Sequence, residues 1–127
     1  MDKPHKQLDA WKLSMDLVID VYRLTDSFPN REKFGLIDQI RRATISIPSN
    51  IAEGAARHTK KEFINYLHIA QGSLSELDTQ VELATRLNYL DGKSRNSLDE
   101  KIRRIDKLIT GLIRHLKISR ETQNSVK

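Results

Sequence analysis

Apolar residues recur at steps of three and four along nearly the whole chain, in four segments separated by short clusters of Pro, Gly, Asn, Ser and Thr. This spacing places apolar side chains on one side of an α-helix. No segment shows the strict alternation of a β-strand. We therefore predict four helices, at about residues 8–27, 32–57, 60–90 and 95–119. The pattern ends after Ser119, so we expect residues 120–127 to form a frayed tail.

The first helix carries two apolar stripes side by side. One stripe consists of Leu8, Trp11, Met15, Val18 and Tyr22, and the other of Leu17, Val21, Leu24 and Phe28. Such a face is wider than one seam of a helical bundle requires. We therefore expect this helix to contact a second subunit as well as its own core.

The second helix contains Pro48 in the middle of its apolar stripe. Proline removes one backbone hydrogen bond and crowds the carbonyl four residues earlier, here that of Thr44. The stripe continues in phase from Ile47 to Ile51. We therefore predict a kink at Pro48 rather than a break.

Polar side chains crowd around that stripe, where a purely structural helix would be apolar. A polar group buried without a partner costs roughly 2–7 kcal/mol, so the cluster indicates either a satisfied network or a site. Asn50 and Glu53 share one helical face. We predict that they hydrogen-bond across the bundle, to residues such as Ser73 or Gln80, and fix its register, with a ligand contact or a subunit interface as the alternatives. The predicted network comprises Gln39, Asn50, Glu53 and Ser73.

The last two helices have regular bundle seams. Thr59 and Glu62 form a capping-box pattern at the start of the third helix, and Asp91-Gly92-Lys93 supplies a stop after it. Short connections between long helices favour antiparallel neighbours. The expected fold is all-α, a single domain over residues 1–127 with up-down-up-down topology.

Composition narrows the possible functions. The chain has no cysteine, no run of about 18–20 apolar residues and no export signal, so we expect a soluble cytoplasmic protein. It has no Glu-x-x-His pair, no GxSxG elbow and no phosphate-binding glycine loop. We expect no catalytic residues, no metal, no cofactor and no enzymatic activity.

The net charge of +5 is concentrated in the last quarter of the chain, where Lys and Arg clearly outnumber acids. A basic surface on one element is typical of polyanion binders, although it also suits a merely solvated face. On the fourth helix the basic residues fall on a face of their own. Arg41 and Arg42 lie at the edge of the second helix's stripe, where they either pair with acids or face phosphate. The candidate nucleic-acid-binding residues are Arg41, Arg42, Arg103, Arg104, Lys107, Arg114 and Lys117.

Three sequence blocks carry a family resemblance: Gln-Ile-Arg-Arg-Ala from Gln39, Ser-Asn-Ile-Ala-Glu-Gly from Ser49 and Gly-Ser-Leu-Ser-Glu-Leu from Gly72. With their order and spacing, the chain resembles, over about residues 8–119, the bacterial four-helix-bundle family encoded in intervening sequences of large-subunit ribosomal RNA genes. That family is similar in fold to the accessory variability protein of diversity-generating retroelements, a basic homopentamer that binds nucleic acid. The resemblance implies a pentamer and a nucleic-acid-associated role.

Two functions therefore stand as expectations. The first is a non-enzymatic homo-oligomeric ring that binds nucleic acid, with RNA favoured, through phosphate contacts. The alternative is a scaffold that docks a protein partner, such as a polymerase, without binding nucleic acid directly. Binding to phosphate would weaken steeply with salt, whereas docking through an apolar patch would persist.

Overall fold

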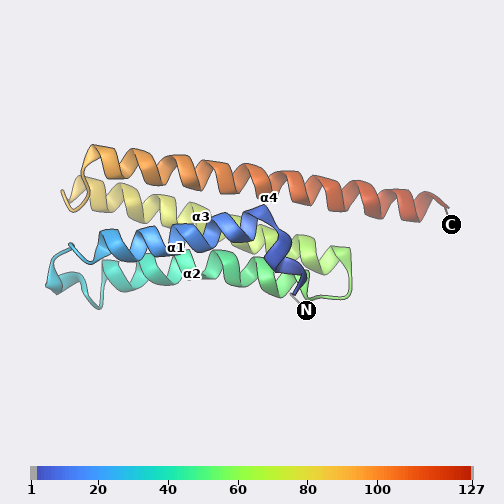
Figure 1. The fold of residues 1–127 in the computed structure, drawn as a ribbon, viewed down its shortest axis with the longest axis horizontal. Helices are drawn as coiled ribbons and strands as arrows, with labels where there is room; N and C mark the ends of the chain where they lie inside the picture. The colour runs from blue at the N-terminus through green and yellow to red at the C-terminus, as the bar shows by residue number, and fades with distance from the viewer. Residues whose placement is uncertain (1–2, 127) are drawn as a thin grey trace.

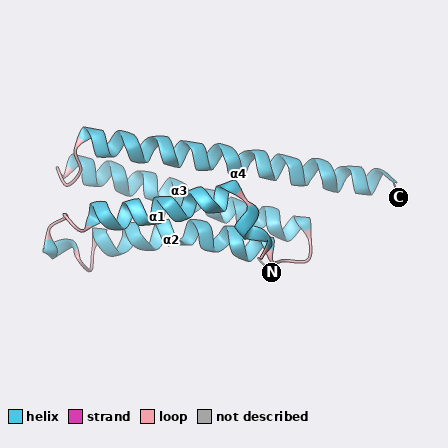
Figure 2. Cartoon of the chain, viewed as in Figure 1, coloured by secondary structure: helices cyan, strands magenta, loops and turns pink. Residues whose placement is uncertain are grey.

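A computed structural model of the protein describes the backbone of residues 3–126 and the side chains of residues 3–119. Two short 3₁₀ turns precede the first two helices, and Figure 2 shows that the connections are short throughout. The elements are η1 (Pro4–Gln7), α1 (Asp9–Thr25), η2 (Asn30–Glu32), α2 (Leu36–Ala55), α3 (Lys60–Arg86) and α4 (Gly92–Val126). The all-α prediction is confirmed.

The four helices form an up-down-up-down bundle, as predicted. Each of α1 and α3 packs against both α2 and α4, and within the described residues the backbones of α1 and α3, and those of α2 and α4, do not approach closely. The helices thus lie at the corners of a square, with α2 and α3 in the most extensive contact and α1 and α4 in the least. Figure 1 shows α4 projecting past the other three at its carboxyl end.

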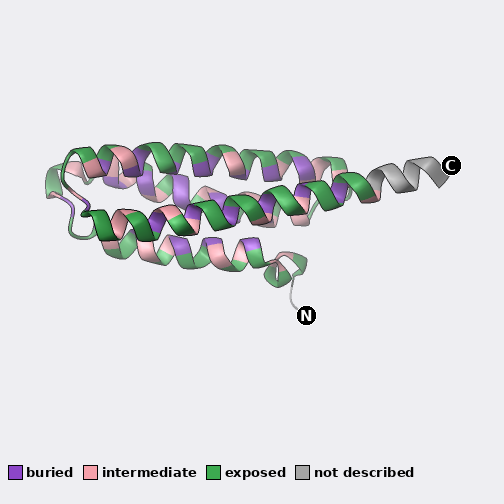
Figure 3. Ribbon diagram, turned by 90° about the horizontal axis from the view of Figure 1, so that it is seen from above, coloured by how far each residue is buried: buried purple, intermediate pink, exposed green. Residues whose placement is uncertain are grey.

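The core is built from one stripe of each helix, seen as the inward-facing purple segments in Figure 3. In α1 the buried stripe includes Leu17 and Val21. The other predicted stripe is only partly buried: Leu8 and Trp11 pack against the core, whereas Met15 is 41% and Tyr22 37% exposed. Equivalent core positions on the other helices are Ile40, Ile47, Ile51, Leu67, Leu74, Leu77, Val81, Ile105 and Ile109.

The second helix begins later than predicted. Residues Asn30–Glu32 form a 3₁₀ turn, and Gly35, whose φ and ψ are both −110°, separates that turn from α2. Residues 32–35 are therefore not α-helical. From Leu36 the helix runs through Pro48 to Ala55 without a break.

The stop after α3 comes earlier than predicted and uses a different residue. Asn88 has φ +64°, and no glycine among the described residues has positive φ. The amide of Tyr89 donates to the carbonyl of Ala84 at 2.8 Å, and the amide of Asn88 to that of Thr85 at 3.0 Å. These two bonds define a Schellman motif with asparagine in the left-handed position. The predicted end near residue 90 was wrong for this reason.

Asp91-Gly92-Lys93 starts α4 instead of stopping α3. The Asp91 carboxylate accepts a 2.7 Å hydrogen bond from the amide of Ser94, as an N-cap does. This bond is the main cause that lowers the pKa of Asp91. The helix backbone also continues past Ser119 to Val126, because residues 112–126 contain no Pro or Gly to end it. The helix therefore extends seven residues past its predicted end at residue 119, and Lys127 lies outside the described residues.

Thr59 caps the start of α3 as predicted, and Glu62 reaches back to the threonine hydroxyl instead of to its backbone amide. The amide of Glu62 donates to the Thr59 hydroxyl at 3.1 Å, and that hydroxyl donates to the Glu62 carboxylate at 3.0 Å. This cap fixes the turn between α2 and α3. No helix in the described part of the chain is long and apolar enough to cross a membrane.

Candidate nucleic-acid interface

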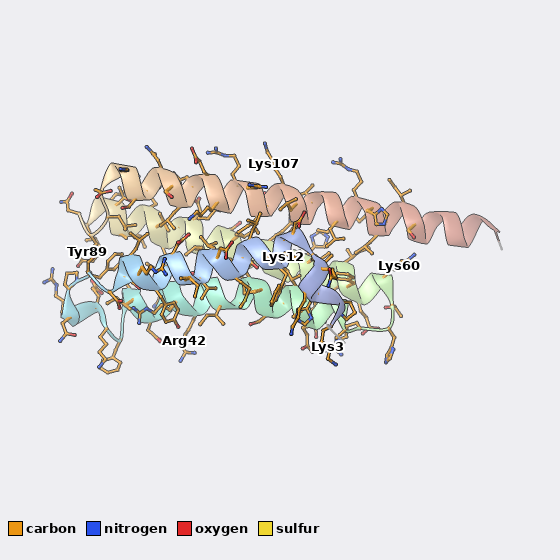
Figure 4. The ribbon with its side chains drawn as sticks, in the orientation of Figure 1. Lys3, Lys12, Arg42, Lys60, Tyr89 and Lys107 are labelled. Atoms are coloured by element: carbon orange, nitrogen blue, oxygen red, sulfur yellow. The ribbon has the colours of Figure 1, made fainter. Side chains whose placement is uncertain are left out.

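The outer face of α4 carries a row of exposed cations. Arg103, Lys107, Arg114 and Lys117 are all exposed, and their spacing places them within one side of the helix. Figure 4 shows Lys107 pointing away from the bundle. Among residues 3–119, no ion pair involves Arg103, Lys107 or Arg114. Their guanidinium and ammonium groups are therefore open to an external anion.

Arg104 is also exposed but points to a different side of α4 from Arg103. Arg103 lines a hollow between α3 and α4, whereas Arg104 lines one between α1 and α4. Neighbouring residues on a helix diverge by about 100°, which accounts for this split. The predicted basic residues of α4 thus border two grooves as well as the ridge between them.

Arg41 is held inside the protein by a set of contacts with α1. Its guanidinium donates to the Thr25 hydroxyl at 2.9 Å and to the Tyr22 carbonyl at 3.3 Å, and pairs with Asp26 at 3.0 Å. It also stacks over the Tyr22 ring at 4.3 Å. Of the two predicted roles, ion pairing therefore describes Arg41, and its side chain ties α2 to α1.

Arg42 has a looser partner. It forms an ion pair one helical turn back with Asp38 at 3.0 Å, with 79% of its side chain exposed. Figure 4 shows it on the outer side of α2. Exposed pairs of this kind contribute little, so Arg42 remains accessible to a ligand. It lies on a different helix from the α4 row.

The predicted polar network across the bundle is wrong in its members. Asn50 donates to the carbonyl of Ser46 on its own helix at 2.7 Å, and Glu53 pairs with Arg57 at 2.6 Å. Gln39 is exposed. The buried stripe of α2 is the predicted one, with Ile47 and Ile51 in the core, and these three polar side chains lie beside it rather than in the contact with α3.

Only Ser73 of the predicted network makes a cross-helix polar contact within the described side chains. It accepts a hydrogen bond from the Ser46 hydroxyl of α2. Thr44 of α2, which is fully buried, donates back to the carbonyl of Ile40 at 2.7 Å. The hydroxyls of Thr44 and Ser46 thus find partners on their own helix or in one serine pair with α3.

Arg95 forms a second network that sequence reasoning missed. It contacts Glu82 at 3.0 Å, Asp99 at 3.0 Å and the Thr85 hydroxyl at 3.3 Å, with 19% of its side chain exposed. Burial lowers the pKa of Arg95, but hydrogen bonds to Glu82 and Asp99 outweigh this and raise it. The pKa of Glu82 is lowered, first by its hydrogen bond from Arg86 and then by that from Arg95. Only the i, i+4 spacing from Arg95 to Asp99 hinted at this role.

Two hollows flank α4 and differ in charge. The one between α3 and α4 is bordered by Asp78, Asp99 and Asp106 together with Arg95 and Arg103. The one between α1 and α4 is bordered by Arg23, Lys101 and Arg104 together with Asp16 and Asp20. No group of three or more His, Asp or Glu side chains in the described part of the chain could hold a metal ion.

These features define the class of protein: an antiparallel four-helix bundle whose fourth helix carries a row of cations without acidic partners among residues 3–119. The chain belongs to the 23S rRNA-intervening sequence protein family, whose model matches residues 6–111. That range includes Arg103, Arg104 and Lys107, whereas Arg114 and Lys117 lie beyond it.

A solved structure of similar fold comes from Bacteroides thetaiotaomicron. It is described as a protein of unknown function from the S23 ribosomal protein family. The two chains are 28% identical, the match covers 82% of this chain and 97% of that one, and the TM-score is 0.76. A comparison with curated proteins gave no significant match.

Proposed function

We propose that this protein is a non-enzymatic, homo-oligomeric bundle that binds nucleic acid, with RNA the favoured ligand, through phosphate contacts. The observation that carries the proposal is the outer face of α4, where Arg103, Lys107 and Arg114 are exposed and have no acidic partner among the described side chains. On a solvated helix face that has no ligand, cations usually form i, i+4 ion pairs with acids, as Arg86 does with Glu82. Membership of a family named for ribosomal RNA intervening sequences adds support.

The row has dimensions suited to a phosphate backbone. From Arg103 to Lys117 the helix rises about 21 Å, at ~1.5 Å per residue. Arginine and lysine on such a ridge contact phosphate oxygens without reading bases. Each neutralised phosphate releases counterions, so binding through this face weakens steeply as salt rises.

The direct test is a filter-binding or mobility-shift titration with structured RNA at low salt. Reversal of Arg103, Lys107 and Arg114 to glutamate is expected to abolish retention while helicity stays unchanged. A matched control reverses Lys12, Lys33 and Lys61, which are exposed on other elements, and it changes the net charge by the same amount. An equal loss of RNA retention in both variants would mean that net charge alone causes the effect. If the wild-type protein at micromolar concentration retains no RNA, the proposed function is refuted.

Self-association into a ring, with five copies the favoured number, is the second part of the proposal. It is supported by the outward stripe of α1, where Met15 and Tyr22 are exposed and Trp11 and Val18 are half-buried. Ile45 of α2, one turn beyond Arg41, is also 41% exposed. Apolar side chains grouped in this way mark protein interfaces. The resemblance to the retroelement accessory protein supports the number of copies.

The same apolar face favours the alternative function, a scaffold that docks a different protein. A pull-down at two salt concentrations separates the two ideas. Partner retention that persists at high salt, with no RNA retention at low salt, would favour the scaffold. RNA retention that disappears at high salt would favour the nucleic-acid binder.

A further inference from the structure

The groove between α1 and α4 is a feature of the surface that the proposed function leaves unused. Since α1 and α4 make the least extensive contact of the four neighbouring pairs, space remains between them. Two hollows of about 420 and 310 Å³ lie along this line and share Asp20, Arg23 and Lys101. Together they form one groove, the α1/α4 groove, whose charged borders are Asp16, Asp20 and Arg23 of α1 and Lys93, Lys101 and Arg104 of α4.

We propose that the α1/α4 groove binds an unpaired, single-stranded segment of nucleic acid. This inference rests on the proposed function and specifies where on the protein, and in which form, the polyanion binds. Its first support is charge. Cations border the groove on both sides, Arg23 from α1 and Lys93, Lys101 and Arg104 from α4, against the acids Asp16 and Asp20.

The other groove beside α4 has the opposite balance. Between α3 and α4, the acids Asp78, Asp99 and Asp106 border the hollow together with Arg95 and Arg103. Arg95 is already paired with Asp99 and Glu82, so the two remaining acids outnumber the one remaining cation. Phosphates are repelled by such a lining. A nucleic-acid strand that contacts the row of cations on the outer face of α4 is therefore attracted to the α1 side of that helix and repelled from the α3 side.

The floor of the α1/α4 groove favours a strand with its bases unpaired. Leu13, Ile19 and Leu24 provide apolar surface between the cations, and Ile19 is 51% exposed. A duplex keeps the faces of its bases stacked inside and offers mainly phosphates to a surface. A single strand can place base faces on apolar side chains while its phosphates meet the cations.

An ion pair stands at the middle of the groove. Lys101 of α4 contacts Asp20 of α1, and both residues border both hollows. The Asp20 carboxylate thus neutralises one of the cations that would otherwise meet phosphate. Removal of the Asp20 charge should therefore strengthen binding of a single strand in this groove. If the strand bound elsewhere on the protein, the same change would have little effect.

The test uses fluorescence anisotropy with a labelled single-stranded RNA of roughly 12 nucleotides, within the site sizes typical of single-strand binders, and with the same RNA as a duplex. The double variant Arg23→Gln, Arg104→Gln is expected to weaken single-strand binding at least tenfold and to reduce the salt slope by about 1 to 2. The control Lys33→Gln, Lys61→Gln removes the same charge from exposed sites elsewhere. It should change the affinity less than threefold.

Two further variants test the central ion pair. Asp20→Asn is expected to tighten single-strand binding several-fold, whereas Asp78→Asn in the α3/α4 hollow should change it little. Circular dichroism confirms that each variant keeps its helicity. Equal effects of Asp20→Asn and Asp78→Asn would overturn the proposal, as would tighter binding of the duplex than of the single strand.

The groove and the proposed function fail in different ways. If the variant with Arg103, Lys107 and Arg114 reversed loses RNA while Arg23→Gln, Arg104→Gln binds the single strand normally, the ridge alone holds nucleic acid. The groove proposal is then wrong and the function stands. If the wild-type protein binds neither RNA form, both are wrong.

Discussion

Gly54 of α2 lies against Tyr66 of α3 with no room for a side chain. A β-carbon on Gly54 would lie 2.7 Å from the β-carbon of Tyr66 and 3.3 Å from the carbonyl oxygen of Phe63. Both neighbours are fixed by the α3 backbone and cannot swing aside. Gly54 is therefore what allows the end of α2 and the start of α3 to approach so closely, in the most extensive helix pair of the bundle.

We predict that Gly54→Ala destabilises the protein by about 1–3 kcal/mol through overpacking. Gly72→Ala and Gly111→Ala are matched controls, because each lies in a helix and a β-carbon added there would have no neighbouring atom within 4 Å. Each control should raise stability by roughly 0.5–1 kcal/mol, the usual gain of alanine over glycine in a helix. Urea denaturation measures all three. A stabilised Gly54→Ala variant would show that the two helices separate easily.

The sequence predicted the elements well because helical periodicity depends on local spacing alone. It failed where a residue's role depends on a neighbouring helix. Asn50 and Glu53 share a face with polar neighbours, but that face lies beside the contact with α3 rather than within it. Arg41 looked equivalent to Arg42, yet its partners Thr25 and Asp26 lie on another element or just beyond its end. Glycine at position 92 suggested a stop, whereas Asn88 occupies the left-handed position.

Arg41 is predicted to matter for stability and not for nucleic acid. Arg41→Ala should cost roughly 1–2 kcal/mol, since it removes hydrogen bonds of a charged group to Thr25 and the Tyr22 carbonyl. Arg41→Lys should recover little of this, because an ammonium cannot reproduce the planar set of donors. Denaturation and RNA titration of the same samples separate the two roles. If an Arg41 variant loses RNA affinity while its stability is unchanged, Arg41 contacts nucleic acid after all.

Asn88 allows a test of the turn between α3 and α4. Asn88→Gly should raise stability by a few tenths to about 1 kcal/mol, because glycine adopts the left-handed conformation without strain. Asn88→Ala should lower it by about 1 kcal/mol, since a β-carbon disfavours positive φ. Thermal melts of the two variants must move in opposite directions. The same direction in both would mean that the Asn88 side chain contributes through another contact.

The charge of Asp91 is predicted to make stability depend on acid pH. Its hydrogen bond from the Ser94 amide lowers its pKa in the folded protein, so the folded state holds its proton less tightly than the unfolded state does. The stabilisation is therefore complete above the ordinary aspartate pKa of about 3.9 and is lost as pH falls through the lowered value. The variant Asp91→Asn keeps a capping side chain without this titration, so it should show a shallower loss of stability between about pH 5 and 2. Parallel curves for the two proteins would exclude Asp91 as a contributor.

The outward face of α1 is predicted to hold the oligomer together. Met15 and Tyr22 expose apolar surface there, and burying it against another copy would gain about 25 cal/mol per Å². Met15→Ser combined with Ile45→Ser should therefore shift the mass measured by light scattering with size exclusion toward the monomer. The fold should survive, because neither side chain belongs to the buried core. The charge reversals of Arg103, Lys107 and Arg114 should leave the mass unchanged, since that face lies on α4. If the wild-type protein is a monomer, the proposed ring is wrong. If the wild type is an oligomer and the double serine variant has the same mass, the interface lies on another face of the bundle.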